Sequence, residues 1–164
     1  MTLPTFDQVM ELPAHADVRV PPEWIDHNEH MNIRHYIDVA SLASLTLMEE
    51  AGFDSTYRDE HRLSLFTVEH HLRYLAEMTL GERLTGHVYP VKLGSKGVHL
   101  VVLVLDRERD QLAMIFETVL LHVDMDARKA VEIPAHVREK ALPLFEKAQQ
   151  LDWSAPLCGV MGIK

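Results

Sequence analysis

One long helical segment followed by an uninterrupted run of strand-like segments most constrains the fold of this 164-residue chain. Between residues 33 and 51, apolar side chains recur at intervals of three and four, as Ile33, Ile37, Ala40, Ala43 and Leu47. This is the helical period. Asn32 or Asn28 is a suitable N-cap, and Gly52 stands where a helix commonly ends. The segment therefore predicts one helix with an apolar stripe that another part of the chain has to cover.

Four segments with the character of β-strands follow this helix and can supply the cover. They are residues 63–74, 82–93, 98–106 and 111–123. Polar turns at 94–97 and 106–110 separate the last three segments, so neighbouring strands are expected to be antiparallel. The order predicts an α+β fold in which the sheet wraps around the helix. A short edge strand at 17–20, a helix at 134–150 and an irregular tail at 151–164 complete the expected fold.

Strict alternation in the first of these strands predicts two faces. Phe66, Val68, His70, Leu72 and Tyr74 are expected on one face, and Leu65, Thr67, Glu69, His71 and Arg73 on the other.

Composition excludes several classes of protein. The formal net charge of −9 argues against nucleic-acid binding, which depends on clustered Lys and Arg. The apolar stretches are far shorter than the roughly 20 residues that a membrane span needs. The single cysteine, Cys158, excludes an internal disulfide, and no signal peptide is visible. The expectation is a cytoplasmic protein without nucleic-acid or membrane partners.

A dense polar motif stands directly before the long helix: Asp26-His27-Asn28-Glu29-His30-Met31-Asn32. Free backbone N–H groups and the positive end of the helix dipole bind anions and polarise carbonyl groups there. A carboxylate that faces water beside such donors can hydrolyse an activated acyl group.

This motif, with Tyr36 after it, resembles the active-site stretch of the hot-dog-fold acyl-CoA thioesterases, the 4-hydroxybenzoyl-CoA thioesterase-like family. The resemblance covers about residues 18–134 and implies a single domain over 1–164, with 135–164 as a C-terminal helix and tail. It implies that Asp26, Asn28 and His30 are catalytic, with Asp26 as the base that activates water or as the nucleophile. A backbone N–H in 28–32 is the expected oxyanion donor. It further implies a homodimer or higher homo-oligomer, an acyl-CoA substrate, and no cofactor besides the coenzyme A of the substrate.

A longer pattern, residues 23–32 followed by Phe66-Thr67-Val68-Glu69 and Arg73-Tyr74-Leu75, is similar to the betainyl-CoA thioesterase branch of carnitine metabolism. Glu69 resembles an acid that positions water in some hot-dog thioesterases, although a solvent-facing role fits its alternation equally; His71 shares its face. Asn32 is expected to be mainly structural, with a contact to substrate as the alternative. A trimethylammonium acyl group favours an aromatic box, for which the candidates are Trp24, Tyr36, Phe66 and Tyr74.

Metal binding is not indicated by spacing. His27 and His30 are three residues apart, His35 falls on another face, and a single cysteine is taken to exclude a thiolate zinc site. Cys158 has no fixed partner and receives no role. The alternatives to an acyl-CoA thioesterase are an acyl-CoA-binding module without turnover and an acyl-carrier-protein thioesterase, with a hot-dog dehydratase ranked last.

Overall fold

The computed structural model describes residues 2–163. Its helices are α1 (Phe6–Met10), the 3₁₀ helix η1 (Pro22–Trp24), α2 (Ile33–Glu50), α3 (Ser55–His61) and α4 (Ala135–Ala148). Its strands are β1 (Ala14–Arg19), β2 (Leu63–Tyr74), β3 (Arg83–Leu93), β4 (Gly97–Asp106), β5 (Gln111–Asp124) and β6 (Lys129–Ala130). None of the helices in the described residues has the length and apolar character to cross a membrane.

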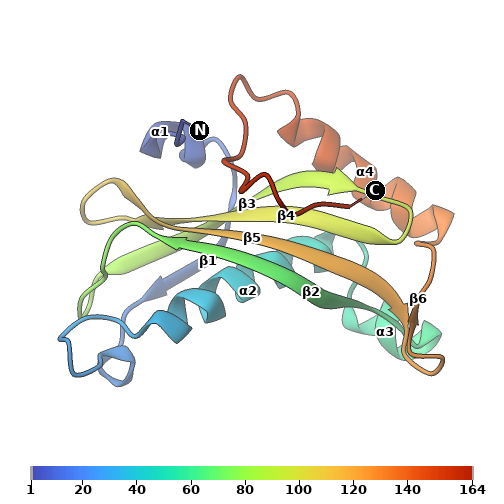
Figure 1. Ribbon diagram of the computed structural model, residues 1–164, viewed down its shortest axis with the longest axis horizontal. Coiled ribbons are helices and arrows are strands. Elements are labelled where there is room, and N and C mark those ends of the chain that lie inside the picture. The colour runs from blue at the N-terminus through green and yellow to red at the C-terminus, as the bar shows by residue number, and fades with distance from the viewer. Residues whose placement is uncertain (1, 164) are drawn as a thin grey trace.

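The strands form one antiparallel sheet in the order β1-β3-β4-β5-β2, with β6 paired to β5. The sheet curls around α2, as Figure 1 shows. The buried stripe of α2 is composed of Tyr36, Val39, Ala40, Ala43 and Leu47. The approach is close at Gly86 of β3, where a Cβ atom would lie 2.9 Å from the Cβ of Ala43. This α+β arrangement is the hot-dog architecture that the resemblance implied.

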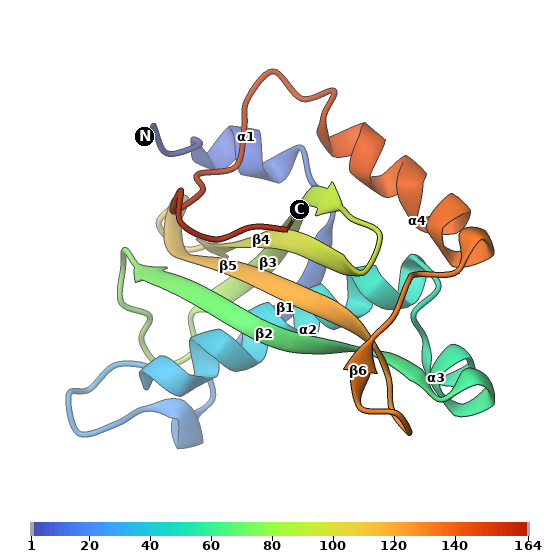
Figure 2. The same ribbon diagram turned by 45° about the vertical axis from the view of Figure 1, so that its right-hand side comes forward.

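The outer face of the sheet, turned away from α2, carries a second apolar layer. Its members on the sheet include Tyr89, Val101 and Ile115. Helix α1 and the C-terminal tail cover this layer, and the tail crosses β4 and β5 in Figure 2. Trp153 of the tail packs on Tyr89 with 5.3 Å between ring centroids. The tail is irregular, as predicted, but it is packed onto the sheet.

Four short elements were absent from the sequence interpretation, namely α1, η1, α3 and β6. Helix α1 begins at a capping box in which Thr5 and Gln8 exchange side-chain and backbone hydrogen bonds. The first strand begins at Ala14, three residues before the predicted start. The predicted central helix, its cap at Asn32, the four long strands and the C-terminal helix agree with the structure to within two residues at each end.

A β-bulge in β2 contradicts the predicted alternation of that strand. Thr67 lies opposite Leu120 and Glu69 opposite Val119, so Val68 is an extra residue without a register partner. A one-residue insertion moves all later side chains to the other face. Leu65 and Thr67 therefore face α2 together with His70, Leu72 and Tyr74, whereas Phe66 shares the outer face with Glu69, His71 and Arg73.

Candidate active site

A tight turn presents the polar motif at the start of α2. Ile25 and Met31 pair as an isolated antiparallel bridge. Within it, the N–H of Asp26 donates to the His30 carbonyl at 3.1 Å, and the N–H of Glu29 donates to the Asp26 carbonyl at 3.0 Å. Glu29 has a φ of 65°, in the left-handed region that closes such turns. The backbone of the motif is thereby fixed before any side chain takes part.

Two donors hold the Asp26 carboxylate in place. Its Oδ1 accepts from the N–H of Asn28 at 2.8 Å, and its Oδ2 accepts from Nδ2 of Asn32 at 3.0 Å. The hydrogen bond from Asn28, followed by that from Asn32, holds the pKa of Asp26 below its ordinary value. Asn32 also caps α2, because its Oδ1 accepts from the N–H of Arg34 at 3.2 Å. The side chain is an ionised, oriented carboxylate at neutral pH.

Most of the backbone N–H groups in residues 28–32 are used within the fold. Those of Met31 and Asn32 donate to carbonyl oxygens of the β2–β3 connection and of η1 at 2.7 and 2.8 Å. Among the described residues, the N–H of His30 finds no acceptor. The N–H of Ile33, at the first position of α2, has no acceptor within its own helix. These two groups are the donors that remain for a carbonyl oxygen.

A pocket of about 280 Å³ opens beside this turn, between the start of α2 and the segment after β2. His30, Tyr36, Tyr74 and Glu77 contribute to its lining. The Tyr36 hydroxyl donates to the carbonyl of Ala76 at 3.0 Å, and its ring packs edge-on against Tyr74 at 5.5 Å between centroids. Burial raises the pKa of Tyr36 to about 12. The pocket combines two aromatic rings with one carboxylate.

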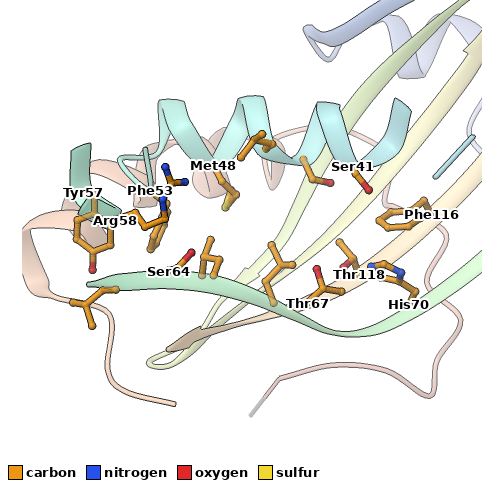
Figure 3. A pocket seen from close by; sticks show the side chains of 15 residues that line it. Ser41, Met48, Phe53, Tyr57, Arg58, Ser64, Thr67, His70, Phe116 and Thr118 are labelled. Carbon is orange, nitrogen blue, oxygen red and sulfur yellow. The ribbon is translucent and has the colours of Figure 1, made fainter. Parts of the chain in front are cut away.

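A second pocket, of about 180 Å³, runs along the groove between α2 and β2 (Figure 3). Hydroxyl groups of Ser41, Ser64, Thr67 and Thr118 line it together with apolar side chains, and its lining includes no Asp or Glu. The Oγ1 of Thr118 is buried and has no hydrogen-bond partner in the described residues. Burial against this groove lowers the pKa of His70. The pocket therefore combines hydroxyl groups and apolar side chains with the imidazole of His70 and the guanidinium of Arg58.

The side chains of most other predicted site residues have partners other than Asp26. Trp24 stacks on His35, with 4.6 Å between centroids and 4° between planes. Phe66 lies under the guanidinium of Arg128, at 5.4 Å. Glu69 and His71 project from the outer face of the sheet.

The prediction that Trp24, Tyr36, Phe66 and Tyr74 form one aromatic box is therefore wrong for a single chain, because only Tyr36 and Tyr74 meet. The Asn28 N–H and the Asn32 side chain contact the Asp26 carboxylate, and His30 belongs to the same turn. Sequence reasoning missed Glu77, which reaches the pocket from the connection after β2, and no local pattern marks it.

Comparison with known proteins identifies the family of the chain. Residues 20–141 match the family model of the thioesterase-like superfamily. A Pseudomonas aeruginosa betainyl-CoA thioesterase is 31% identical over 144 residues, which cover 88% of this chain and 91% of that protein. A Rhizobium meliloti L-carnitine dehydrogenase/betainyl-CoA thioesterase is 32% identical over 137 residues, and the match spans 84% of this chain but only 27% of that longer protein.

The fold has solved counterparts as well. A Staphylococcus aureus protein whose structure was solved in complex with CoA superimposes with a TM-score of 0.82 at 23% identity. The match covers 93% of this chain and 97% of that one.

Proposed function

The chain belongs to the thioesterase-like superfamily, and on that premise we propose that it is an acyl-CoA thioesterase. The reaction adds water to an acyl-CoA thioester and yields the free acid and coenzyme A. The observation that carries the proposal is the ionised Asp26 carboxylate, oriented by Asn28 and Asn32 at the start of α2. The relatives named as betainyl-CoA thioesterases support the same reaction class.

The proposed mechanism uses the charge of Asp26 and the N–H groups that the turn leaves free. The carbonyl oxygen of the thioester accepts from the N–H groups of His30 and Ile33, where the helix dipole also stabilises the developing negative charge. Asp26 takes a proton from the attacking water, or attacks the thioester carbon itself, expels the coenzyme A thiolate and forms an anhydride that water then hydrolyses. The His30 ring, whose Nδ1 lies 3.3 Å from the Met31 carbonyl, orients the water or donates to the leaving thiolate. Single turnover in heavy-oxygen water separates the two routes, because only the nucleophilic route exchanges oxygen into Asp26.

We place the acyl group in the pocket beside the turn. Tyr36, Tyr74 and Glu77 would there surround a trimethylammonium group with two π-systems and a carboxylate, the features that recognise such a cation. The names of the relatives point to the same acyl group. A neutral acyl group would instead suit the hydroxyl-lined groove between α2 and β2.

A second copy of the chain is proposed to complete the site. Strand β2 is a 12-residue edge of the sheet, and Val68 on it is 54% exposed. Long exposed edges of this kind are templates for pairing with another strand. Because Glu69 lies on the outer face of its own chain, it reaches an Asp26 site only if a second copy supplies it. Sedimentation at several protein concentrations tests whether the chain is a dimer, a tetramer or a monomer.

The test of the function is release of free thiol from a panel of acyl-CoAs with short, medium, aromatic and betainyl acyl groups. The wild-type protein is expected to release coenzyme A, fastest with betainyl-CoA. Asp26→Asn is expected to lower kcat by roughly 10²- to 10⁴-fold, because the amide cannot accept a proton. Asp7→Asn, on exposed α1 away from the site, is the matched control and should keep full activity.

Two outcomes would contradict the proposal. Full turnover by Asp26→Asn would refute the role of that carboxylate. Absence of turnover across the panel, with a thermal shift on adding acyl-CoA, would identify a binding module.

A further inference from the structure

Four side chains with metal-binding chemistry meet on the outer face of the sheet, beneath the C-terminal tail. They come from four segments of the chain: His71 from β2, His99 from β4, Glu117 from β5 and Cys158 from the tail. The neighbouring outer-face positions of β4 and β5, such as Val101 and Ile115, are apolar. A polar cluster of this composition inside an apolar layer needs a physical explanation.

The geometry of the cluster brings unlike ligand atoms together. One ligand atom from each of His71, Glu117 and Cys158 lies within 4.8 Å of the others. Glu117 is completely buried, with one carboxylate oxygen 2.8 Å from Nε2 of His99 and the other accepting from the N–H of Cys158 at 2.7 Å. The bond to the Cys158 backbone fixes where the tail crosses the sheet, and therefore where the thiol lies.

We propose that His71, Glu117 and Cys158 bind a zinc ion, with His99 holding the Glu117 carboxylate in position. Sulfur, imidazole nitrogen and carboxylate oxygen are the ligand types that zinc takes in tetrahedral sites, whereas a thiolate disfavours Mg²⁺ and Ca²⁺. Tetrahedral zinc separates such ligand atoms by about 3.3–3.6 Å, given its bond lengths. The cluster must therefore contract by about 1.5 Å at most. His71 and Cys158 are half-buried and can make this adjustment, while Glu117 stays fixed.

His99 fits the role of an outer partner. Carboxylates that bind metals are commonly hydrogen-bonded in turn, and such partners fix the orientation of the ligand. His99 is 3% exposed and donates to no other described side chain than Glu117. Bound zinc would join the tail to β2 and β5, and would do so on the face of the sheet opposite to α2. The inference is therefore independent of the proposed thioesterase activity.

The test uses the full-length protein, freed of metal with a chelator and titrated with zinc or cobalt. One ion per chain is expected, together with the sulfur-to-cobalt absorption band of a thiolate ligand and a higher melting temperature. Cys158→Ser should abolish the band and weaken zinc binding by at least about 100-fold, the upper end of the cost of losing an outer-shell partner. His71→Gln should weaken zinc binding while leaving the fold intact.

The control is His136→Gln, on the exposed side of α4 and away from the cluster, which should bind zinc and cobalt as the wild type does. Equal zinc affinity and equal cobalt spectra in the wild type and Cys158→Ser would overturn the proposal. So would a cobalt site that survives in His71→Gln and is lost in His136→Gln, because the ion would then lie elsewhere.

Discussion

Asn32 serves two purposes that substitution can separate. Its Oδ1 caps α2 through the N–H of Arg34, and its Nδ2 donates to the Asp26 carboxylate. Asn32→Ser retains a good N-cap but removes the amide donor, whereas Asn32→Ala removes both. Asn32→Asp keeps the cap and places a second negative charge against Asp26. The three variants therefore distinguish a role in folding from a role in orienting the carboxylate.

The expected magnitudes differ between stability and activity. Loss of an Asn cap costs typically about 1 kcal/mol of stability, so Asn32→Ala should melt roughly 2–4 °C lower, and Asn32→Ser should stay within about 1 °C of the wild type. In all three variants the pKa of Asp26 is expected to rise toward the usual carboxyl value, most in Asn32→Asp. Only the ionised form of Asp26 can act. The acidic limb of kcat/KM should therefore move to higher pH, by less in Asn32→Ser and by more in Asn32→Asp.

The assay is thiol release at several pH values, combined with thermal unfolding of the same preparations. A pH profile and a kcat that are both unchanged by Asn32→Ser would refute the orienting role. A fall in activity that follows the melting temperature alone would assign Asn32 to the helix cap only. At neutral pH the carboxylate stays ionised in Asn32→Ser, so any loss of rate there measures orientation rather than protonation.

Three predictions concern stability. Glu29→Gly should raise the free energy of unfolding by about 1 kcal/mol in urea titrations, because glycine accepts the left-handed φ of 65° without strain; a loss would show that the Glu29 side chain contributes. Burial acts to raise the pKa of Asp106, but hydrogen bonds from Gln111 and Arg109 outweigh it and lower that pKa. Asp106 therefore stabilises the folded state at pH values above the ordinary carboxyl pKa, and this stabilisation is lost as pH falls through its lower folded pKa. In Asp106→Asn, the urea midpoint should fall less steeply than in the wild type as pH is lowered. An equally steep fall would contradict this. Gly86→Ala should cost roughly 1–3 kcal/mol by calorimetry, since its Cβ would meet α2 at 2.9 Å, and a neutral effect would mean that the helix shifts freely.

Periodicity predicted the long elements because each of them depends on a local pattern. The stripe of α2 and the apolar runs of β3 to β5 are visible within ten to eighteen residues, and Asn32 and Gly52 mark the ends of α2. Helix α1 has only five residues, so it shows hardly more than one turn of any period. Its one sequence signal is the capping box at Thr5 and Gln8.

In the site, too, contacts between neighbours in sequence could be predicted, whereas contacts between distant segments could not be predicted from local patterns. Asp26, Asn28, His30 and Asn32 lie together because they are neighbours in one turn. The meeting of Tyr36 with Tyr74 requires the end of β2 to pass the start of α2, and so depended on the resemblance. Contacts that depend on strand register, such as those of Glu69, cannot be read from a single strand.

One extra residue in β2 explains both the largest error and the outer-face cluster. Leu65 and Thr67 face α2, so strict alternation would have placed Glu69 and His71 on that side as well. The bulge at Val68 instead sends them to the outer face, where the register sets His71 directly opposite Glu117. His99 and Glu117 are 18 residues apart in sequence, and Glu117 and Cys158 are 41 apart. Spacing alone therefore argued against a zinc site, because a ligand set from three strands and a tail becomes visible only once the register is known.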